Sequence, residues 1–217
     1  MIALCLPGKW YSGEFLQCMD SLYHYFAQEK IEWFLRQRYS ANVFFSRNML
    51  LGVDPGDDVV PDATKPFGGR EYDYILWIDA DAVFTVDNFC QLIARDKDFI
   101  GGIARPSAEE ERLNCGRLNQ EGETSPLLKK HLETLEKRED GLIEVDYAGL
   151  HFVLMKRGVI EKVGYPWFMP YNRQVKNKMF FPSEDIGFCL RARAAGVNIF
   201  VDPGVRVGHE RSKVIWP

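Results

Sequence analysis

Apolar and polar residues follow one another along the chain in blocks that predict alternating strands and helices. Residues 2–6 form a short apolar run that stops at Pro7-Gly8, a pattern typical of a buried strand that ends at a loop. Ser12 is suited to cap a following helix, because apolar residues recur after it at helical spacing. Residues 74–78 are apolar throughout, as in a central strand of a parallel sheet that is buried on both faces.

The later blocks extend this alternation. We predict further strands over residues 31–35, 98–104, 143–155, 198–202 and 205–207. We predict further helices over residues 41–52, 87–95, 157–163 and 184–195, the last with Ser183 and Gly196 at its ends. The charged, apolar-poor run 107–141 is interpreted as a surface excursion with one helix near 126–138, and residues 167–181 as an aromatic loop. Alternating strands and helices predict an α/β fold whose mainly parallel sheet is flanked by helices.

The composition is that of one globular domain. The chain has 217 residues, of which 46% are hydrophobic and 27% charged, which favours a sizeable core over disorder. A formal net charge of −4 gives no footprint for a polyanion, so no nucleic acid is expected as a partner. The five cysteines are widely spaced without a CxxC pair, as expected for free thiols in a reducing compartment. Because no apolar run approaches about 20 residues and no signal-peptide pattern is present, we expect a cytoplasmic protein with no membrane span.

Two carboxylates follow directly after the strand predicted to be buried on both faces. Asp79 and Asp81 are separated by Ala80 alone, and side chains two apart in an extended segment point the same way. Two anions held close together repel unless a cation joins them, and oxygen ligands favour Mg²⁺ or Mn²⁺. The alternative is that the pair merely ends a strand and faces water. Since ligands bind beyond the carboxyl ends of parallel strands, Pro7 and Arg38 are grouped with the pair as one candidate site.

The segment Ile75-Leu76-Trp77-Ile78-Asp79-Ala80-Asp81-Ala82-Val83-Phe84 resembles the D-x-D signature of GT-A glycosyltransferases, and the resemblance extends over most of the chain. Further segments that resemble motifs of this family are Arg47-Asn48, Asp98-Phe99-Ile100-Gly101-Gly102, Gly149 to Arg157, and Ser183-Glu184-Asp185. More narrowly, the chain is similar to the N-terminal domain of a chlorovirus glycosyltransferase that modifies the viral capsid protein. The glycine fingerprint of dinucleotide oxidoreductases is absent.

The resemblance implies a single GT-A domain over residues 1–217. Its Rossmann-like nucleotide-binding half would span residues 1–105, and a mixed acceptor-side half would span residues 106–217. The chain ends soon after His209, so we keep open the hypothesis that it is a fragment of a longer polypeptide. The viral resemblance would locate the protein in the host cytoplasm.

The resemblance also implies roles for single residues. His209 would complete a metal site with Asp79 and Asp81, although an isolated late histidine is more often structural or exposed. Asp185 would act as general base and Glu184 would hold acceptor hydroxyls. The alternative is that both acids only stabilise the N-terminus of a helix.

A third group of residues would contact the nucleotide donor. Guanidinium groups suit bidentate contacts to phosphate or uracil oxygens, although each arginine alone is more often a solvated surface charge. The expected donor-binding residues are Pro7, Arg38, Arg47, Asp79, Ala80, Asp81, Arg105 and Gly149.

The expected activity is therefore metal-dependent, inverting transfer of a sugar from a UDP-sugar to an acceptor hydroxyl, with Mn²⁺ or Mg²⁺ as cofactor. The acceptor would be a glycan or glycoprotein, and the viral resemblance suggests the capsid glycoprotein. The choice of uridine as the base of the donor rests only on its frequency in the family that the chain resembles, not on any residue. One alternative is a nucleotidyltransferase that makes the sugar nucleotide, although only Pro7-Gly8-Lys9 stands where such enzymes carry a Gly-rich loop. The other is a module that binds nucleotide sugars without turnover.

Overall fold

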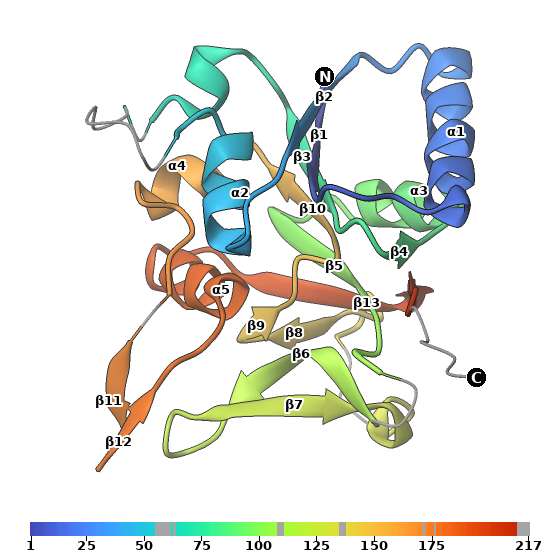
Figure 1. Ribbon diagram of the computed structural model, residues 1–217. Coiled ribbons are helices and arrows are strands. Elements are labelled where there is room, and N and C mark those ends of the chain that lie inside the picture. The colour runs from blue at the N-terminus through green and yellow to red at the C-terminus, as the bar shows by residue number, and fades with distance from the viewer. Residues whose placement is uncertain are drawn as a thin grey trace, which may run out of the picture.

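The computed structural model describes residues 1–54, 62, 64–107, 111–134, 138–170, 172–175 and 177–211. A seven-stranded sheet forms its centre (Figure 1). In spatial order the strands are β2 (Trp33–Arg38), β1 (Ile2–Pro7), β3 (Tyr74–Ile78), β10 (Phe152–Lys156), β5 (Phe99–Ile103), β13 (Ile199–Arg206) and β8 (Ile143–Val145). Only β10 and β8 run opposite to the other five. The predicted α/β fold with a mostly parallel central sheet is confirmed.

The central strands form because their apolar runs are buried on both faces of the sheet. All six residues of β1 are buried. Cys5 and Trp77 pack into one core, whereas Leu4 and Leu76 pack into the other. This alternation is the period-two geometry of a strand, and it creates two apolar layers that helices must cover.

Helices cover both faces. Figure 1 shows α1 (Gly13–Gln28) and α3 (Val86–Ala94) on one face and α2 (Val43–Leu50), α4 (Val159–Val163) and α5 (Glu184–Ala194) on the other. The predicted cap of the first helix is confirmed, because the backbone N–H of Phe15 donates to Ser12 Oγ at 3.1 Å. Gly196 lies just beyond α5 with φ +83°, a left-handed conformation that suits glycine and ends the helix. A short 3₁₀ turn, η1, spans Pro66–Gly69.

Three smaller sheets accompany the central one among the described residues. Their strands are β6 (Arg112–Leu118), β7 (Thr124–Leu128) and β9 (Tyr147–Ala148) in one, β11 (Arg173–Val175) and β12 (Lys178–Phe180) in the second, and β4 (Ala82–Val83) and β14 (Gly208–His209) in the third. A 3₁₀ turn, η2 (Lys129–His131), follows β7. In Figure 1 the sheet of β6, β7 and β9 lies below the central sheet and the β11–β12 hairpin projects at its side.

The prediction of a helix near residues 126–138 is wrong where the structure describes that range. Residues 124–128 instead form β7, which pairs with β6. Leu113 and Cys115 are buried two residues apart on β6, whereas the charged side chains of Arg112 and Arg117 are exposed. A strand with one buried face carries many charges, so charge density alone did not identify a surface helix.

Other boundaries also differ from the sequence expectations. The range 143–155, predicted as one strand, is divided into β8, β9 and β10, and β10 runs antiparallel to β3. Trp167 and Phe168, expected in an aromatic loop, are buried in the core, and Tyr171 of that expectation lies outside the described residues. Among the described residues, no helix has both the length and the apolar character required to cross a membrane.

Candidate metal centre and active site

The candidate site begins where β3 ends. The turn after this strand is closed by a hydrogen bond from the Ala82 N–H to the Asp79 carbonyl at 3.0 Å. The chain then forms β4, which pairs with β14 so that His209 lies opposite Ala82. The Glu210 N–H also donates to the Asp81 carbonyl at 2.8 Å. Backbone pairing thus brings His209 beside Asp81.

His209 is held in one orientation by a contact at each ring nitrogen. Nε2 lies 2.9 Å from Asp81 Oδ2, and Nδ1 lies 3.0 Å from the carbonyl oxygen of Arg105. The Arg105 carbonyl and the Asp81 carboxylate both only accept, so a neutral ring donates to one of them. A proton on Nδ1 would leave the Nε2 lone pair for a cation held together with Asp81.

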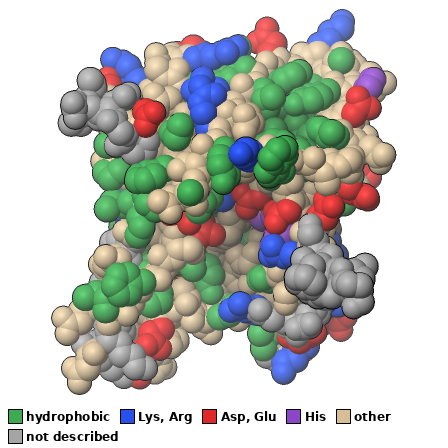
Figure 2. Space-filling view, viewed as in Figure 1, with side chains coloured by type: hydrophobic (Ala, Val, Ile, Leu, Met, Phe, Trp, Pro, Cys, Tyr) green, Lys and Arg blue, Asp and Glu red, His purple; other side chains and the backbone are tan. Residues whose placement is uncertain are grey.

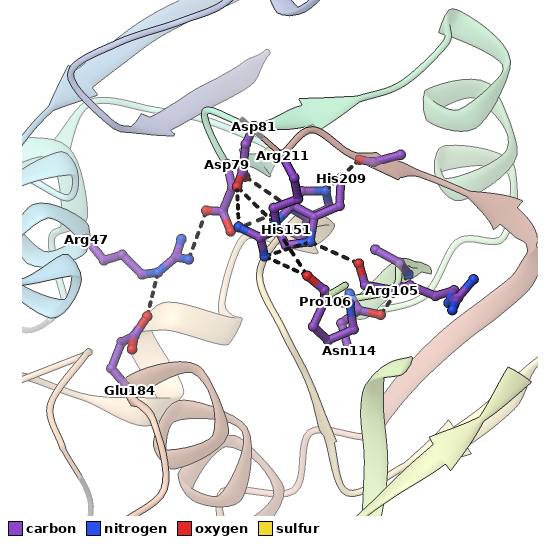
Figure 3. Close-up of polar contacts among 12 residues, drawn as sticks. Arg47, Asp79, Asp81, Arg105, Pro106, Asn114, His151, Glu184, His209 and Arg211 are labelled. Atoms are coloured by element: carbon purple, nitrogen blue, oxygen red, sulfur yellow. Dashed lines mark hydrogen bonds and ion pairs between the residues drawn. The ribbon is translucent and has the colours of Figure 1, made fainter. Parts of the chain in front are cut away.

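His151 is a second histidine at this centre, which sequence reasoning missed. It precedes β10, whose antiparallel pairing with β3 brings its carbonyl oxygen within 3.0 Å of the Asp79 N–H. Its Nε2 lies 2.9 Å from the Gly208 carbonyl oxygen. Its Nδ1 lies 3.8 Å from Asp79 Oδ2 and 3.7 Å from Asp81 Oδ1. Figure 3 shows both histidine rings grouped with the two aspartates.

These side chains fit a divalent cation. One donor atom from each of Asp81, His151 and His209 lies within 4.8 Å of the others. In both histidines the remaining ring nitrogen contacts a backbone carbonyl, which is the usual orientation of metal-bound imidazoles. Carboxylate and imidazole donors together suit Mn²⁺ among the ions that also bind phosphate oxygens. Asp79 is outside this group of three.

Opposite charges stabilise one another at the centre. Burial disfavours the charged carboxylates, but Arg47 and His151 hold the pKa of Asp79 below its usual range, and His209 and His151 do the same for the pKa of Asp81. Burial alone would lower the pKa of His151, but the neighbouring Asp79 carboxylate raises it above its ordinary value. The carboxylates therefore stay ionised and ready to bind a cation.

Arg211 is a further residue that the sequence analysis missed. Its Nη1 lies 3.5 Å from Asp81 Oδ2, and its Nε and Nη2 donate to the Pro106 carbonyl at 3.1 and 2.8 Å. The guanidinium is thereby held against the aspartate. Its only sequence signal was a basic residue two positions after His209.

Asp185, the expected base, lies at the first turn of α5. Its Oδ1 accepts a hydrogen bond from the Ile186 N–H at 2.8 Å and another from the Ser183 hydroxyl. The position that a Cβ would take on Gly149 is only 3.3 Å from Asp185 Oδ2 and 3.3 Å from the Asn114 carbonyl oxygen. The absence of a side chain at Gly149 therefore lets the Asp185 carboxylate approach this backbone closely.

Gly149→Ala is expected to shift the Asp185 carboxylate by a few tenths of an ångström and to lower turnover several-fold without unfolding the protein. Steady-state kinetics together with a thermal melt would measure both effects. Gly141→Ala is unsuitable as a control because its φ is +80°, whereas Gly13→Ala meets no atom within 4 Å and is expected to leave turnover unchanged. Equal turnover by Gly149→Ala and the wild type would contradict the close approach.

The other expected donor-binding residues lie at two places. Pro7 and Arg38 end neighbouring strands and are paired, with the Gly8 N–H donating to the Arg38 carbonyl at 3.0 Å. Ala80 packs against this loop, since a Cβ on Gly8 would lie 2.6 Å from the Cβ of Ala80. The side chain of Arg105 points away from the aspartates in Figure 3, toward Glu111 at 3.9 Å. Its backbone carbonyl, rather than its guanidinium, contributes to the centre.

Arg47 and Glu184 face each other across the site. The Arg47 side chain is 3% exposed, and it contacts Glu184 Oε1 through Nε at 3.1 Å and Asp79 Oδ1 through Nη2 at 3.0 Å. Burial raises the pKa of Glu184, Arg47 opposes this shift, and the neighbouring Asp185 raises the pKa further. Arg47 and Glu184 are thus both bound in ion pairs with other side chains of the protein.

A cleft of about 730 Å³ opens beside the metal centre, with His209 and Arg211 in its wall. Its other charged side chains are mostly basic: Arg105, Lys129, Lys130 and Arg206 against Glu111 and Glu133. Figure 2 shows the middle of this face hollowed, with acidic side chains in the hollow and basic ones close by. The volume is sufficient for a small substrate next to the centre.

The mostly parallel central sheet with its flanking helices and small antiparallel sheets matches the GT-A fold, as the following solved structures show. Among solved structures, A197 from STIV is similar over 97% of this chain and 86% of that chain, at 17% identity and a TM-score of 0.57. GalNAc-T7, solved with UDP, GalNAc and Mn²⁺, is similar over 96% of this chain, at 10% identity and a TM-score of 0.53. This chain matches only 42% of the GalNAc-T7 chain. No family model and no curated protein sequence matches the chain.

Proposed function

We propose that this protein is a metal-dependent glycosyltransferase that moves a sugar from a UDP-sugar to an acceptor hydroxyl. The observation that carries the proposal is the group of Asp81, His151 and His209 at the carboxyl edge of a GT-A sheet. GalNAc-T7, which is similar in fold, was solved with UDP, GalNAc and Mn²⁺, and this supports both the nucleotide and the metal.

Asp81, His151 and His209 would hold the cation. The donor set of one carboxylate and two imidazoles favours Mn²⁺ over Mg²⁺, which prefers oxygen ligands and keeps several waters. When bound, the ion would offset the negative charge that develops on the leaving diphosphate. Arg211, which lies against Asp81, would add a second positive charge on the same side.

The donor nucleotide would lie at the ends of β1 and β2, near Pro7 and Arg38, because ligands of parallel sheets bind at this edge. Gly149 would lie beside the donor sugar, and its lack of a side chain lets the Asp185 carboxylate approach the backbone closely. Ala80 would border the nucleotide, since the small side chain lets the loop after β1 approach the end of β3 closely.

Asp185 would take the proton of the acceptor hydroxyl as its oxygen attacks the anomeric carbon. The new carbon–oxygen bond forms while the bond to the diphosphate breaks, and UDP leaves with the electron pair. One displacement on the face opposite the leaving group inverts the anomeric configuration. The resemblance to chlorovirus enzymes suggests a capsid glycan as acceptor.

Nucleotide binding is expected to require the cation. UDP should bind at least about tenfold more tightly in Mn²⁺ than in EDTA, and the nucleotide with metal should raise the melting temperature, because ligands stabilise the state that binds them. Calorimetry and a thermal-shift screen with Mn²⁺, Mg²⁺, Fe²⁺ and Zn²⁺ would measure this. Equal UDP affinity in all conditions would remove the metal from the scheme.

The reaction products distinguish the proposed activity from its two alternatives. Incubation with a UDP-sugar and an acceptor should release UDP together with a glycosylated product. Release of pyrophosphate from UTP and a sugar phosphate would indicate a nucleotidyltransferase. Tight binding without any product would indicate a binding module.

A further inference from the structure

The buried guanidinium of Arg47 joins the two acidic motifs of the site. Arg47 lies on α2, and its guanidinium bridges Asp79 at the end of β3 to Glu184 at the start of α5. The three side chains come from segments far apart in the sequence, and the Arg47–Glu184 pair is separated by 137 residues. Figure 3 shows Arg47 extended between the two carboxylates.

The resemblance to GT-A enzymes would have Arg47 contact the nucleotide, but its surroundings do not favour that role. The side chain is 3% exposed, and the Glu184 side chain is 10% exposed. Nε and Nη2 already donate to carboxylates of the protein, and Nη1 is buried with no hydrogen-bond partner. The guanidinium carbon also lies 5.5 Å from the centre of the Trp77 ring. Asp79, Glu184 and Trp77 thus surround the guanidinium, which is almost fully buried.

The helix that carries Arg47 is itself fixed to the core. The next residue, Asn48, donates from Nδ2 to the Phe168 carbonyl at 2.6 Å, and the Phe168 N–H lies 3.3 Å from Asn48 Oδ1. A paired amide contact of this kind opposes rotation or sliding of α2. The guanidinium is therefore a fixed point from which both carboxylates are oriented.

We propose that Arg47 is a positioning residue that fixes the distance between the metal centre and the catalytic base. Its hydrogen bond to Asp79 Oδ1 leaves Asp79 Oδ2 facing His151. Its hydrogen bond to Glu184 holds in place the residue next to Asp185. The role rests on the proposed glycosyltransferase function and adds to it a link between donor and acceptor sides.

Arginine suits this task better than lysine. Its planar guanidinium presents several N–H groups in fixed directions, so it binds two carboxylates at once, whereas an ammonium is a point charge on a flexible stem. Without the cation, Asp79 and Glu184 would be like charges near each other and near Asp185, and they would move apart. A displacement of about 1 Å at a catalytic group is enough to cost about 10²-fold in rate.

Arg47→Lys tests the proposal, because it keeps the positive charge and removes the planar guanidinium that binds both carboxylates at once. We expect kcat for sugar transfer to fall about 10²-fold while the UDP dissociation constant in Mn²⁺ changes less than about threefold. Arg95→Lys is the matched control. Arg95 Nε donates to Asp202 Oδ2 at 2.7 Å, an arginine–carboxylate pair away from the site, so this change should leave kcat unchanged.

Glu184→Gln is the second variant, used also if Arg47→Lys does not fold. Its amide oxygen still accepts from Arg47 Nε but lacks the charge, so kcat should fall less, again with little change in UDP affinity. The double variant should lose less than the product of the two single losses, because both act through one bridge. Weakened UDP binding with unchanged kcat would overturn the proposal and indicate direct contact of Arg47 with the donor. Independent, multiplying losses would overturn it too. A wild-type protein that neither binds UDP nor turns over would instead reject the glycosyltransferase function itself.

Discussion

Asp185→Asn is expected to lower the rate of sugar transfer by about 10²–10⁴-fold while UDP affinity stays within a few-fold. Asparagine keeps nearly the same shape, and its amide oxygen can still accept from the Ile186 N–H, but it cannot take a proton from the acceptor. Initial rates at saturating donor and calorimetry with UDP and Mn²⁺ would separate the two effects.

Asp146→Asn provides the control for an aspartate-to-asparagine change near α5. Asp146 Oδ1 lies 3.1 Å from Arg193 Nη2, and the residue is outside the proposed site, so turnover should remain at the wild-type level. Near-normal turnover by Asp185→Asn would remove the base from the mechanism and make Glu184 the next candidate. Retention of anomeric configuration in the product, measured by NMR, would contradict single displacement altogether.

His151→Phe is expected to produce the second large effect, a loss of metal-dependent binding. The phenyl ring fills the space of a side chain that is 7% exposed but offers no lone pair to a cation. Substitutions of residues that only orient metal ligands cost about 10–100-fold in metal affinity, so loss of a ligand should cost more. Turnover should fall in parallel and recover partly at high Mn²⁺, which distinguishes this variant from Asp185→Asn.

His24→Phe is the matched control, because His24 lies on α1 with its side chain 73% exposed. Its Mn²⁺ affinity, measured by calorimetry or by the electron paramagnetic resonance of free Mn²⁺, should equal that of the wild type. Unchanged Mn²⁺ affinity in His151→Phe would show that the histidine is not a ligand. The cation would then depend on Asp79, Asp81 and His209, as the resemblance alone implied.

The parts of the fold that the sequence predicted well are those with local causes. The strands predicted over 2–6 and 74–78 agree with β1 and β3 to within one residue, because runs of apolar residues buried on both faces have few alternatives. The edge strand β2 was predicted too early. It continues to Arg38, because an edge strand accepts polar residues that a central strand would not.

The site could be predicted only in part, for a topological reason. Asp79 and Asp81 were proposed because their motif is contiguous, and His209 because it follows the last strand predicted from the sequence. His151 could not be found this way, since its proximity depends on β10 pairing antiparallel with β3. A shift of one residue in that register would turn its side chain to the opposite face. The available signal was a polar residue at the head of an apolar strand.

Arg47 illustrates a second limit. Three consecutive polar residues of α2, Ser46, Arg47 and Asn48, are buried, although the sequence there suggests a helix with an exposed basic position. Only the approach of β3 and α5 in space supplies the carboxylates that make this burial tolerable. Tertiary partners of this kind leave no periodic trace in the sequence.

The three proposed ligands have a consequence for folding, because Asp81 and His209 are 128 residues apart and His151 lies between them. Such a chelate does not exist in the unfolded chain, and it assembles only after the strands from both ends of the sequence have paired. Contacts between remote segments form late and slowly, since loop-closure entropy must be overcome first. Acquisition of Mn²⁺ would therefore report that β10 has paired with β3 and β14 with β4. Free ion at about 100 times its dissociation constant would add about 2.7 kcal/mol to the free energy of unfolding, which a chelator would then withdraw.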